Sequence, residues 1–287
     1  MMALIGVLVL LVMVFGGFAL TGGNLGPILH ALPHEMLIIG GAAIGALIIS
    51  NNVKSLKELG AGTMRIFKGP RFRKADYLAA IFLTVKLVRL LKVEGAVAVE
   101  AHVESPQSSN IWSEYPQLLA DPFFVSLVCD TLRLLVVSTG TVSSVAIEDV
   151  LDSAIATQHQ HAMEPCEKMH VLADALPALG IVAAVLGVVK TMGSIDQPPA
   201  VLGAMIGSAL VGTFLGVLLA YGLVGPAAAR LKHIIEADAE IYHVVRRVIL
   251  ASIRNQPQPI VLEQARTAIS PANQPAFSEV FEGMRGR

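Results

Sequence analysis

The stretch VGTFLGVLLAYGLVGP, residues 211–226, carries one central hydroxyl, Thr213, in a run that is otherwise apolar apart from Tyr221 near its end. The stretch contains no acid and no base. Ion transport through lipid usually requires an ionisable group within the membrane. Either the chain does not conduct ions, or a partner supplies the titrating carboxylate and Thr213 faces a wet path. Without such a path, Thr213 would bond the carbonyl four residues earlier in its own helix.

The other ionisable groups beside the apolar segments lie at the segment ends. They are Glu35, Asp174 and Lys190. We expect these side chains to extend toward the membrane surface, which leaves the centre of every apolar segment without a charge.

A histidine-rich segment, QHQHAMEPCEKMH, contains His159, His161, His170 and Cys166. Because His159 and His161 are two residues apart, a helix would point them in different directions. The segment therefore indicates a solvated helical face rather than a metal site. The sequence also lacks Ser-His-Asp, paired-carboxylate, Walker and GxGxxG patterns, so we predict no catalytic residue, no cofactor and no enzymatic activity.

Two prolines lie in neighbouring apolar segments. Pro177 is near the start of one segment and Pro226 is near the end of the next, which predicts similar depths if the two run antiparallel. A proline frees a backbone carbonyl and can bend a helix. The residues therefore predict either two helix ends or a paired hinge or gate.

Small residues recur at four-residue spacing in the apolar segments. The pairs are Gly41 with Gly45, Gly180 with Ala184, Gly203 with Gly207, and Gly212 with Gly216. Small residues let membrane helices approach closely, because lipid provides no hydrophobic drive for association. The pattern predicts close helix packing within the chain or against another chain, and the number of pairs favours an oligomer.

These residues belong to a chain of 287 residues that is 54% hydrophobic and 15% charged. Soluble domains carry about 25% charged residues, and about 20 apolar residues span a bilayer as a helix. We predict four transmembrane helices, at 3–21, 36–52, 174–192 and 201–225. No basic residue precedes the first and no small-residue cleavage site follows it, so it is expected to be a retained helix.

Basic residues predict the orientation. Of the 21 Lys and Arg residues, 12 lie in 54–168 and 8 in 230–287, and the positive-inside bias makes these two segments cytoplasmic. Both termini are then cytoplasmic, with short outer loops at 22–33 and 193–200. The net charge of -1 and the lack of a basic stripe give no indication of nucleic-acid binding.

The insert between the second and third spans is predicted to be helical. Apolar residues recur at three- and four-residue spacing in ADYLAAIFLTVKLVRLLKV. A second helix is predicted over Pro122–Val137, with Asp121 as its N-cap. A third is expected to begin at Ser143 or Ser144 and to restart at Pro165.

The predicted fold is therefore an all-α membrane protein with four transmembrane helices, a helical cytoplasmic insert between spans two and three, and a helical cytoplasmic C-terminal tail. Cys129 and Cys166 fall in the insert, which predicts free thiols. The predicted segments are transmembrane 1–53, cytoplasmic 54–170, transmembrane 171–229 and cytoplasmic 230–287.

Four stretches, one in each span, carry a family resemblance. They read FGGFALTGGNLG, LIIGGAAIGALIISNN, DALPALGIVAAVLGVVKTMGS and GSALVGTFLGVLLAYGLVGP. They resemble the MotA family of stator subunits of the bacterial flagellar motor, and the likeness extends over span order, insert length and tail. The third and fourth stretches are specific, and four spans separate the chain from the relatives ExbB and TolQ, which have three.

The resemblance implies an inner-membrane ring of five copies around two MotB chains, each supplying a membrane Asp that titrates and a part that grips peptidoglycan. The family's two prolines correspond to Pro177 and Pro226. Ala184 and Thr213 both lie near mid-depth, consistent with lining one ion pathway, and Tyr221 is a further candidate for it. Sodium-driven members carry Thr at the position of Ala184, so the resemblance implies the proton as coupling ion.

The resemblance also implies a contact with the rotor protein FliG through a charged pair. In this chain the pair falls at Lys92 and Glu100. The family usually carries Arg at the first position; Lys keeps the charge but lacks the planar guanidinium.

The residues leave two other functions open. One is an ExbB- or TolQ-like energiser of an outer-membrane system, which a neighbouring gene for a TonB-dependent partner would indicate. The other is a non-conducting membrane scaffold, which the absence of proton flux in the presence of a partner would indicate.

Overall fold

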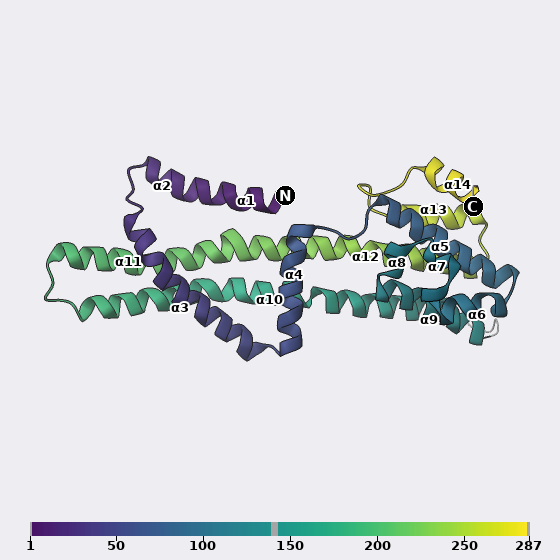
Figure 1. Cartoon of the computed structure of the whole chain (residues 1–287), viewed down its shortest axis with the longest axis horizontal. Coiled ribbons are helices and arrows are strands. Elements are labelled where there is room, and N and C mark those ends of the chain that lie inside the picture. The colour runs from purple at the N-terminus through teal and green to yellow at the C-terminus, as the bar shows by residue number, and fades with distance from the viewer. Residues whose placement is uncertain (1, 139–142, 286–287) are drawn as a thin grey trace. The chain divides into compact units, whose positions relative to one another are not determined.

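The computed structural model describes residues 2–138 and 143–285, and every regular element in these ranges is a helix (Figure 1). The predicted all-α fold is confirmed. The chain forms two compact units, Met1–Gly69 with Met163–Ile234, and Pro70–Ala162 with Ile235–Arg287. Each unit therefore combines an earlier and a later part of the chain.

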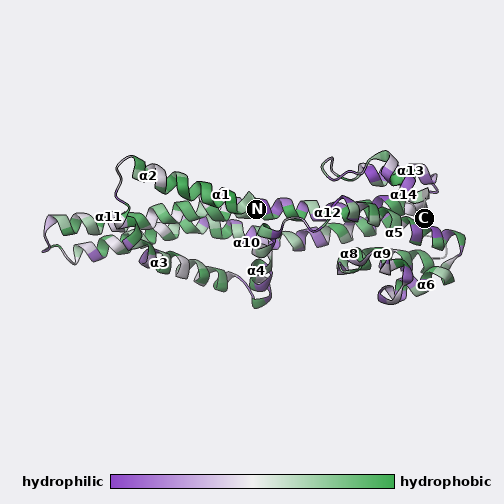
Figure 2. Cartoon of the chain, turned by 45° about the horizontal axis from the view of Figure 1, so that its top comes forward, coloured by the Kyte–Doolittle hydropathy of each residue, from purple (hydrophilic) through white to green (hydrophobic). Residues whose placement is uncertain are grey.

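The first unit contains the apolar helices, and Figure 2 shows α1 as almost wholly hydrophobic. Two long helices, α10 and α12, contribute to both units. The elements are α1 (Met2–Leu11), a π-helical turn (Val12–Gly16), α2 (Gly17–Leu20), α3 (Gly26–Ser50), α4 (Val53–Lys68), α10 (Ser144–Met192), α11 (Pro199–Val217), a second π-helical turn (Leu218–Val224) and α12 (Gly225–Ile253).

Within the described residues, four helical runs are long and apolar enough to cross a membrane, as predicted: Met2–Leu20, Gly26–Ser50, Ser144–Met192 and Pro199–Ile253. The second run begins ten residues earlier than expected, so the predicted outer loop over 22–33 is wrong beyond Leu25. Pro27 lies in the first turn of α3, where its fixed φ suits a helix start. Pro33 lies inside α3, where neighbouring membrane helices make a proline tolerable.

The predicted restart at Pro165 and the predicted helix end at Pro226 are wrong, while the alternative of a hinge or gate at Pro177 and Pro226 stays a prediction. Helix α10 continues through both Pro165 and Pro177. Pro226 does not end a helix, because α12 continues to Ile253. The π-helical turn over Leu218–Val224 ends two residues before Pro226. Its wider hydrogen-bond spacing accommodates the missing N–H donor of the proline.

The second unit is a helical domain around a core that includes Trp112, Tyr77 and Phe124. The rings of Trp112 and Phe124 meet edge to face with centroids 6.2 Å apart. Its remaining elements are α5 (Lys74–Val93), α6 (Ala96–Glu104), a 3₁₀ turn (Pro106–Ser108), α7 (Asn110–Ser113), α8 (Pro116–Leu119), α9 (Pro122–Val137), α13 (Gln258–Thr267) and α14 (Phe277–Arg285).

The predicted helix over Pro122–Val137 and its cap at Asp121 are confirmed. The Asp121 carboxylate accepts a hydrogen bond from the Phe124 N–H at 3.0 Å and another from the Tyr242 hydroxyl at 3.1 Å. Its second oxygen also lies 3.3 Å from Arg71 Nη1. Because Asp121 is 2% exposed, this one buried carboxylate ties the start of α9 to α12.

We expect Asp121→Ala to lower the free energy of unfolding by about 2–4 kcal/mol, because it removes the cap and leaves the Tyr242 hydroxyl buried without its acceptor. The chain's single tryptophan is buried in the same core, so its fluorescence can follow thermal unfolding. Asp149→Ala is the matched control, since Asp149 is exposed. An equal loss of unfolding free energy in the two variants would contradict the stabilising role of the Asp121 cap.

Candidate functional site between α3, α10 and α11

Helices α10 and α11 approach so closely that only glycine fits at their crossing. A Cβ atom on Gly180 would lie 2.7 Å from the carbonyl oxygen of Gly212, and one on Gly216 would lie 2.6 Å from that of Leu176. Gly203 and Gly207, further toward the start of α11, have no atom within 4 Å of an added Cβ. The structure thus brings Gly212 and Gly216 to an internal contact and leaves the other pair on an open face.

The register of the two helices separates the two prolines. Gly180 faces Gly216 and Gly187 faces Ala209, so the helices run antiparallel and the position level with Pro177 is near residue 219. Pro226 lies about seven residues further along, a rise of roughly 10 Å. The prediction that Pro177 and Pro226 lie at similar depths does not agree with this register. The π-helical turn before Pro226 is level with Pro177 instead.

Thr213 lies beside the glycine crossing, where its Cα would be 3.3 Å from a Cβ on Gly180. Its side chain is half-buried, and its hydroxyl forms no hydrogen bond with the described residues. The hydroxyl of Thr191, by contrast, donates to the carbonyl of Gly187 four residues earlier, at 2.9 Å. Thr213 therefore keeps a free hydroxyl close to the contact of α10 and α11.

The other predicted pathway residues differ in exposure. Ala184 is half-buried on α10 and follows Ala183, whose Cβ is 3.1 Å from the place of a Cβ on Gly212. Tyr221 lies in the π-helical turn and is 66% exposed. Tyr221 therefore faces away from the crossing, on the outside of this chain.

Glu35 is a functional candidate for which the predicted extension toward the membrane surface is wrong. It lies inside α3 and is only 7% exposed. Its Oε2 has no hydrogen-bond partner among the described residues. A Cβ on Gly212 would come within 2.5 Å of that oxygen. The missing side chain at Gly212 thus makes room for a carboxylate at the helix crossing.

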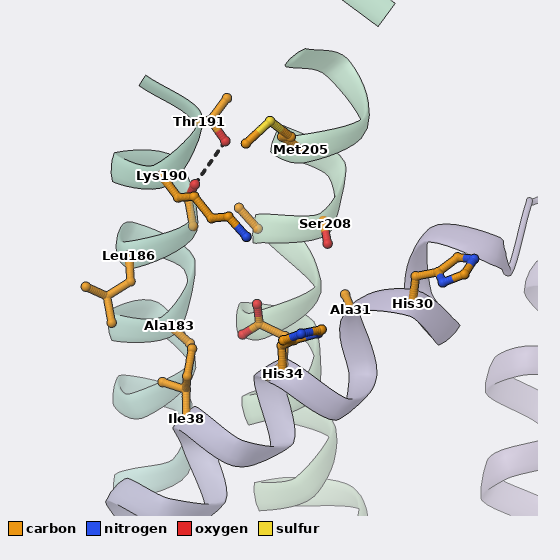
Figure 3. Close-up of a pocket in the computed structure, with 13 residues that line it drawn as sticks. His30, Ala31, His34, Ile38, Ala183, Leu186, Lys190, Thr191, Met205 and Ser208 are labelled. Atoms are coloured by element: carbon orange, nitrogen blue, oxygen red, sulfur yellow. Dashed lines mark hydrogen bonds between the residues drawn. The ribbon is translucent and has the colours of Figure 1, made fainter. Parts of the chain in front are cut away.

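A cavity of about 420 Å³ opens beside Glu35 between the three helices (Figure 3). Figure 3 shows Lys190 from α10, Ser208 from α11 and His34 from α3 around the same space. The remaining lining residues are mostly apolar. They are His30, Ala31, Ile38, Ala183, Leu186, Gly187, Thr191, Met205 and Ala209.

Lys92 and Glu100, the predicted rotor-facing pair, lie in the second unit. Lys92 lies in the last turn of α5, and its ammonium donates to the Ser252 carbonyl and, at 2.9 Å, to Asn255 Oδ1. Partial burial lowers the pKa of Lys92. Glu100 is exposed on α6. Lys92 thus binds the C-terminal end of α12, while Glu100 is free to meet another surface.

Both cysteines are buried free thiols, as predicted. Burial raises the pKa of Cys129 to about 12. This thiol therefore stays protonated and poorly reactive at neutral pH.

Two family profiles match the chain. The first, motility protein A N-terminal, matches residues 4–95, and the second, the MotA/TolQ/ExbB proton channel family, matches residues 122–243. Together they cover the four apolar helical runs except the first two residues of α1 and the end of α12.

Full-length proteins are similar as well. Motility protein A of Salmonella typhimurium is 37% identical over 99% of this chain and 95% of its own length. The structure of C. jejuni MotAB has a TM-score of 0.72 at 20% identity and covers 94% of this chain and 95% of that one. The flagellar MotAB stator complex of Bacillus subtilis has a TM-score of 0.69 at 22% identity, covering 91% and 93%. Both structures share the fold.

The glycine crossing gives a test within one helix. Gly216→Ala places a methyl group against the backbone of α10, and we expect a loss of about 1–3 kcal/mol in stability or a failure to accumulate in the membrane. Gly203→Ala is the control, because nothing lies near an added Cβ there. The measurements are the amount of each variant in the membrane and its melting temperature after purification. A Gly216→Ala protein as stable as Gly203→Ala would contradict the close approach of the two helices.

Proposed function

Because the chain belongs to the motility protein A family of the MotA/TolQ/ExbB proton channels, we propose that it is a stator subunit of the bacterial flagellar motor. With MotB it forms a unit that conducts protons and converts their flow into torque on the rotor. The observation that carries this proposal is the 37% identity to a motility protein A over 99% of the chain.

The four apolar helices support a multi-pass protein of the inner membrane. In the proposed orientation both termini are cytoplasmic, residues 54–170 and 230–287 lie inside, and the connection between α10 and α11 lies outside. The working assembly is a ring of five copies around two MotB chains. The open glycine face at Gly203 and Gly207 suits a contact between copies or with MotB, since small residues permit close approach.

The chain supplies the wall of the ion path and MotB supplies the membrane Asp. The free hydroxyl of Thr213 lines the path, and the methyl side chain of Ala184 leaves room for it on the opposite helix. The phenol of Tyr221 lies on the exposed face of the chain. Pro177 and the turn before Pro226 loosen the backbones of α10 and α12 and let the wall yield as the Asp changes charge. One charge crossing the membrane gains about 2.3 kcal/mol per 100 mV, which drives each step.

Torque passes to FliG through Lys92 and Glu100. Exposed ion pairs contribute only about 0–1 kcal/mol each, which suits contacts that form and break at every step. Lys92 has a second role, because its bonds to Ser252 and Asn255 hold the end of α12. A rotor test must therefore separate its charge from its hydrogen bonds.

The coupling ion gives the first test. We expect swimming speed to be unchanged when sodium is removed from the medium and to fall to zero when a protonophore is added, because protons carry the energy. A strain in which this chain is replaced by a sodium-driven homologue serves as the control. Loss of motility without sodium would contradict the proton assignment.

Thr213→Val keeps the shape of the side chain and removes its hydroxyl. We expect proton flux and swimming speed to fall about five- to tenfold, the equivalent of one hydrogen bond, and Thr213→Ser to restore most of both. Thr21→Val is the control, since the Thr21 hydroxyl bonds the Phe18 carbonyl of its own helix. Normal proton flux in Thr213→Val would contradict a role of the hydroxyl in conduction and leave Thr213 with a packing role alone.

The rotor contact is tested by charge. Lys92→Glu and Glu100→Lys are each expected to reduce torque in tethered cells, and reversing the FliG charges should recover it. Lys92→Gln keeps a donor for the end of α12 and removes only the charge, so it should lower torque without lowering the melting temperature. If both reversals, singly and together, leave swimming normal, the rotor assignment is wrong.

A further inference from the structure

Glu35 combines burial with the lack of a partner, which is rare for a carboxylate. It is 7% exposed, and its Oε2 forms no hydrogen bond with any described residue. An ionised carboxylate in such a place is strongly disfavoured unless it is paired. The proposed role of MotB leaves this second acid within the membrane helices without a function.

The surroundings of Glu35 keep it connected to solvent. The adjoining cavity is lined by Lys190 and Thr191, which lie at the very end of α10, and by His30 near the start of α3. These helix ends meet the short connections of the chain, at 21–25 and 193–198. The cavity therefore extends from that end of the helices to the carboxylate.

The charges of the cavity decide which ion Glu35 can hold. The titratable and charged groups that line the cavity beside it are His30 and His34 on α3 and Lys190 on α10; the lining residues of α11, such as Ser208, carry no charge. One carboxylate facing an ammonium group and two imidazoles offers no set of oxygen ligands for a metal cation. A proton needs no such set, and it neutralises the buried carboxylate.

Gly212 links this acid to the path wall. The carboxylate occupies the space that a side chain at position 212 would fill, one residue before Thr213. A proton held on Glu35 therefore lies against Gly212, the residue before Thr213 on α11, close to the crossing of α10 and α11.

We propose that Glu35 is a proton-accepting site at the outer end of the ion path, which takes protons from the cavity water and passes them toward the membrane Asp of MotB. This rests on the proposed function. In the step, a hydronium ion gives its proton to the Glu35 carboxylate and leaves water; the resulting acid then gives the proton to the MotB carboxylate and returns to its ionised form.

The direct test uses dicyclohexylcarbodiimide on the complex of this chain with MotB. The reagent adds to protonated carboxyl groups in apolar surroundings and leaves an N-acylurea, which peptide mass spectrometry locates. We expect labelling of Glu35 at about pH 6 and several times less at about pH 9. The MotB Asp lies on a different chain, so its labelling is read separately.

Proton flux in vesicles gives the second readout. Glu35→Gln is expected to lower flux by about tenfold or more while MotB still co-purifies, and Glu35→Asp should retain a substantial part. Asp196→Asn is the matched control, because Asp196 is an exposed acid in the connection between α10 and α11; its flux should equal that of the wild type.

The outcomes separate the two levels of the proposal. If the wild-type complex conducts, then an unlabelled Glu35 at both pH values, or a Glu35→Gln complex with more than half the wild-type flux, overturns the role of Glu35 and leaves the stator assignment standing. If the wild-type chain, paired with a MotB freed of any plug, does not conduct, the proposed function itself fails. Labelling is measured on the native chain, so it decides even if Glu35→Gln does not assemble.

Discussion

The near-contact of two backbones, at Gly180 on α10 and Gly216 on α11, is the constraint on which the first unit depends. Lipid provides no hydrophobic drive for helix association, so these helices are held by close van der Waals packing that any side chain at either position would prevent. The same crossing sets the antiparallel register. That register places Thr213 beside α10, brings Glu35 against Gly212, and puts the π-helical turn rather than Pro226 level with Pro177.

This packing divides the chemistry between chains. The crossing carries a free hydroxyl at Thr213 and the small residue Ala184, and the acid beside it, Glu35, belongs to α3. Glu35 lies where the cavity ends, so it can collect a proton without completing a path. A wall of this kind conducts only when another chain brings a carboxylate to it, which agrees with the family to which the protein belongs.

Much of the fold follows from local sequence, and the exceptions have physical reasons. Charge-free windows predicted four spans, and Asp121 before Pro122 predicted α9, because composition and capping act over a few residues. The predictions of a helix restart at Pro165 and a helix end at Pro226 are wrong, because packing and a π-helical turn accommodate prolines that would end an isolated helix. Glu35 was misplaced because its burial depends on Gly212, which is 177 positions away in the sequence. The pairing of Glu35 with a glycine is visible only once the helices are placed together.

The central claim is that this chain forms the wall of a proton path that a partner completes. Proton uptake by sealed vesicles under an imposed membrane potential tests it most directly, with the chain alone compared with the chain and a MotB freed of any plug. The account predicts no flux above that of empty vesicles for the chain alone and clear flux for the pair. Equal flux in both, or flux in neither, would contradict it.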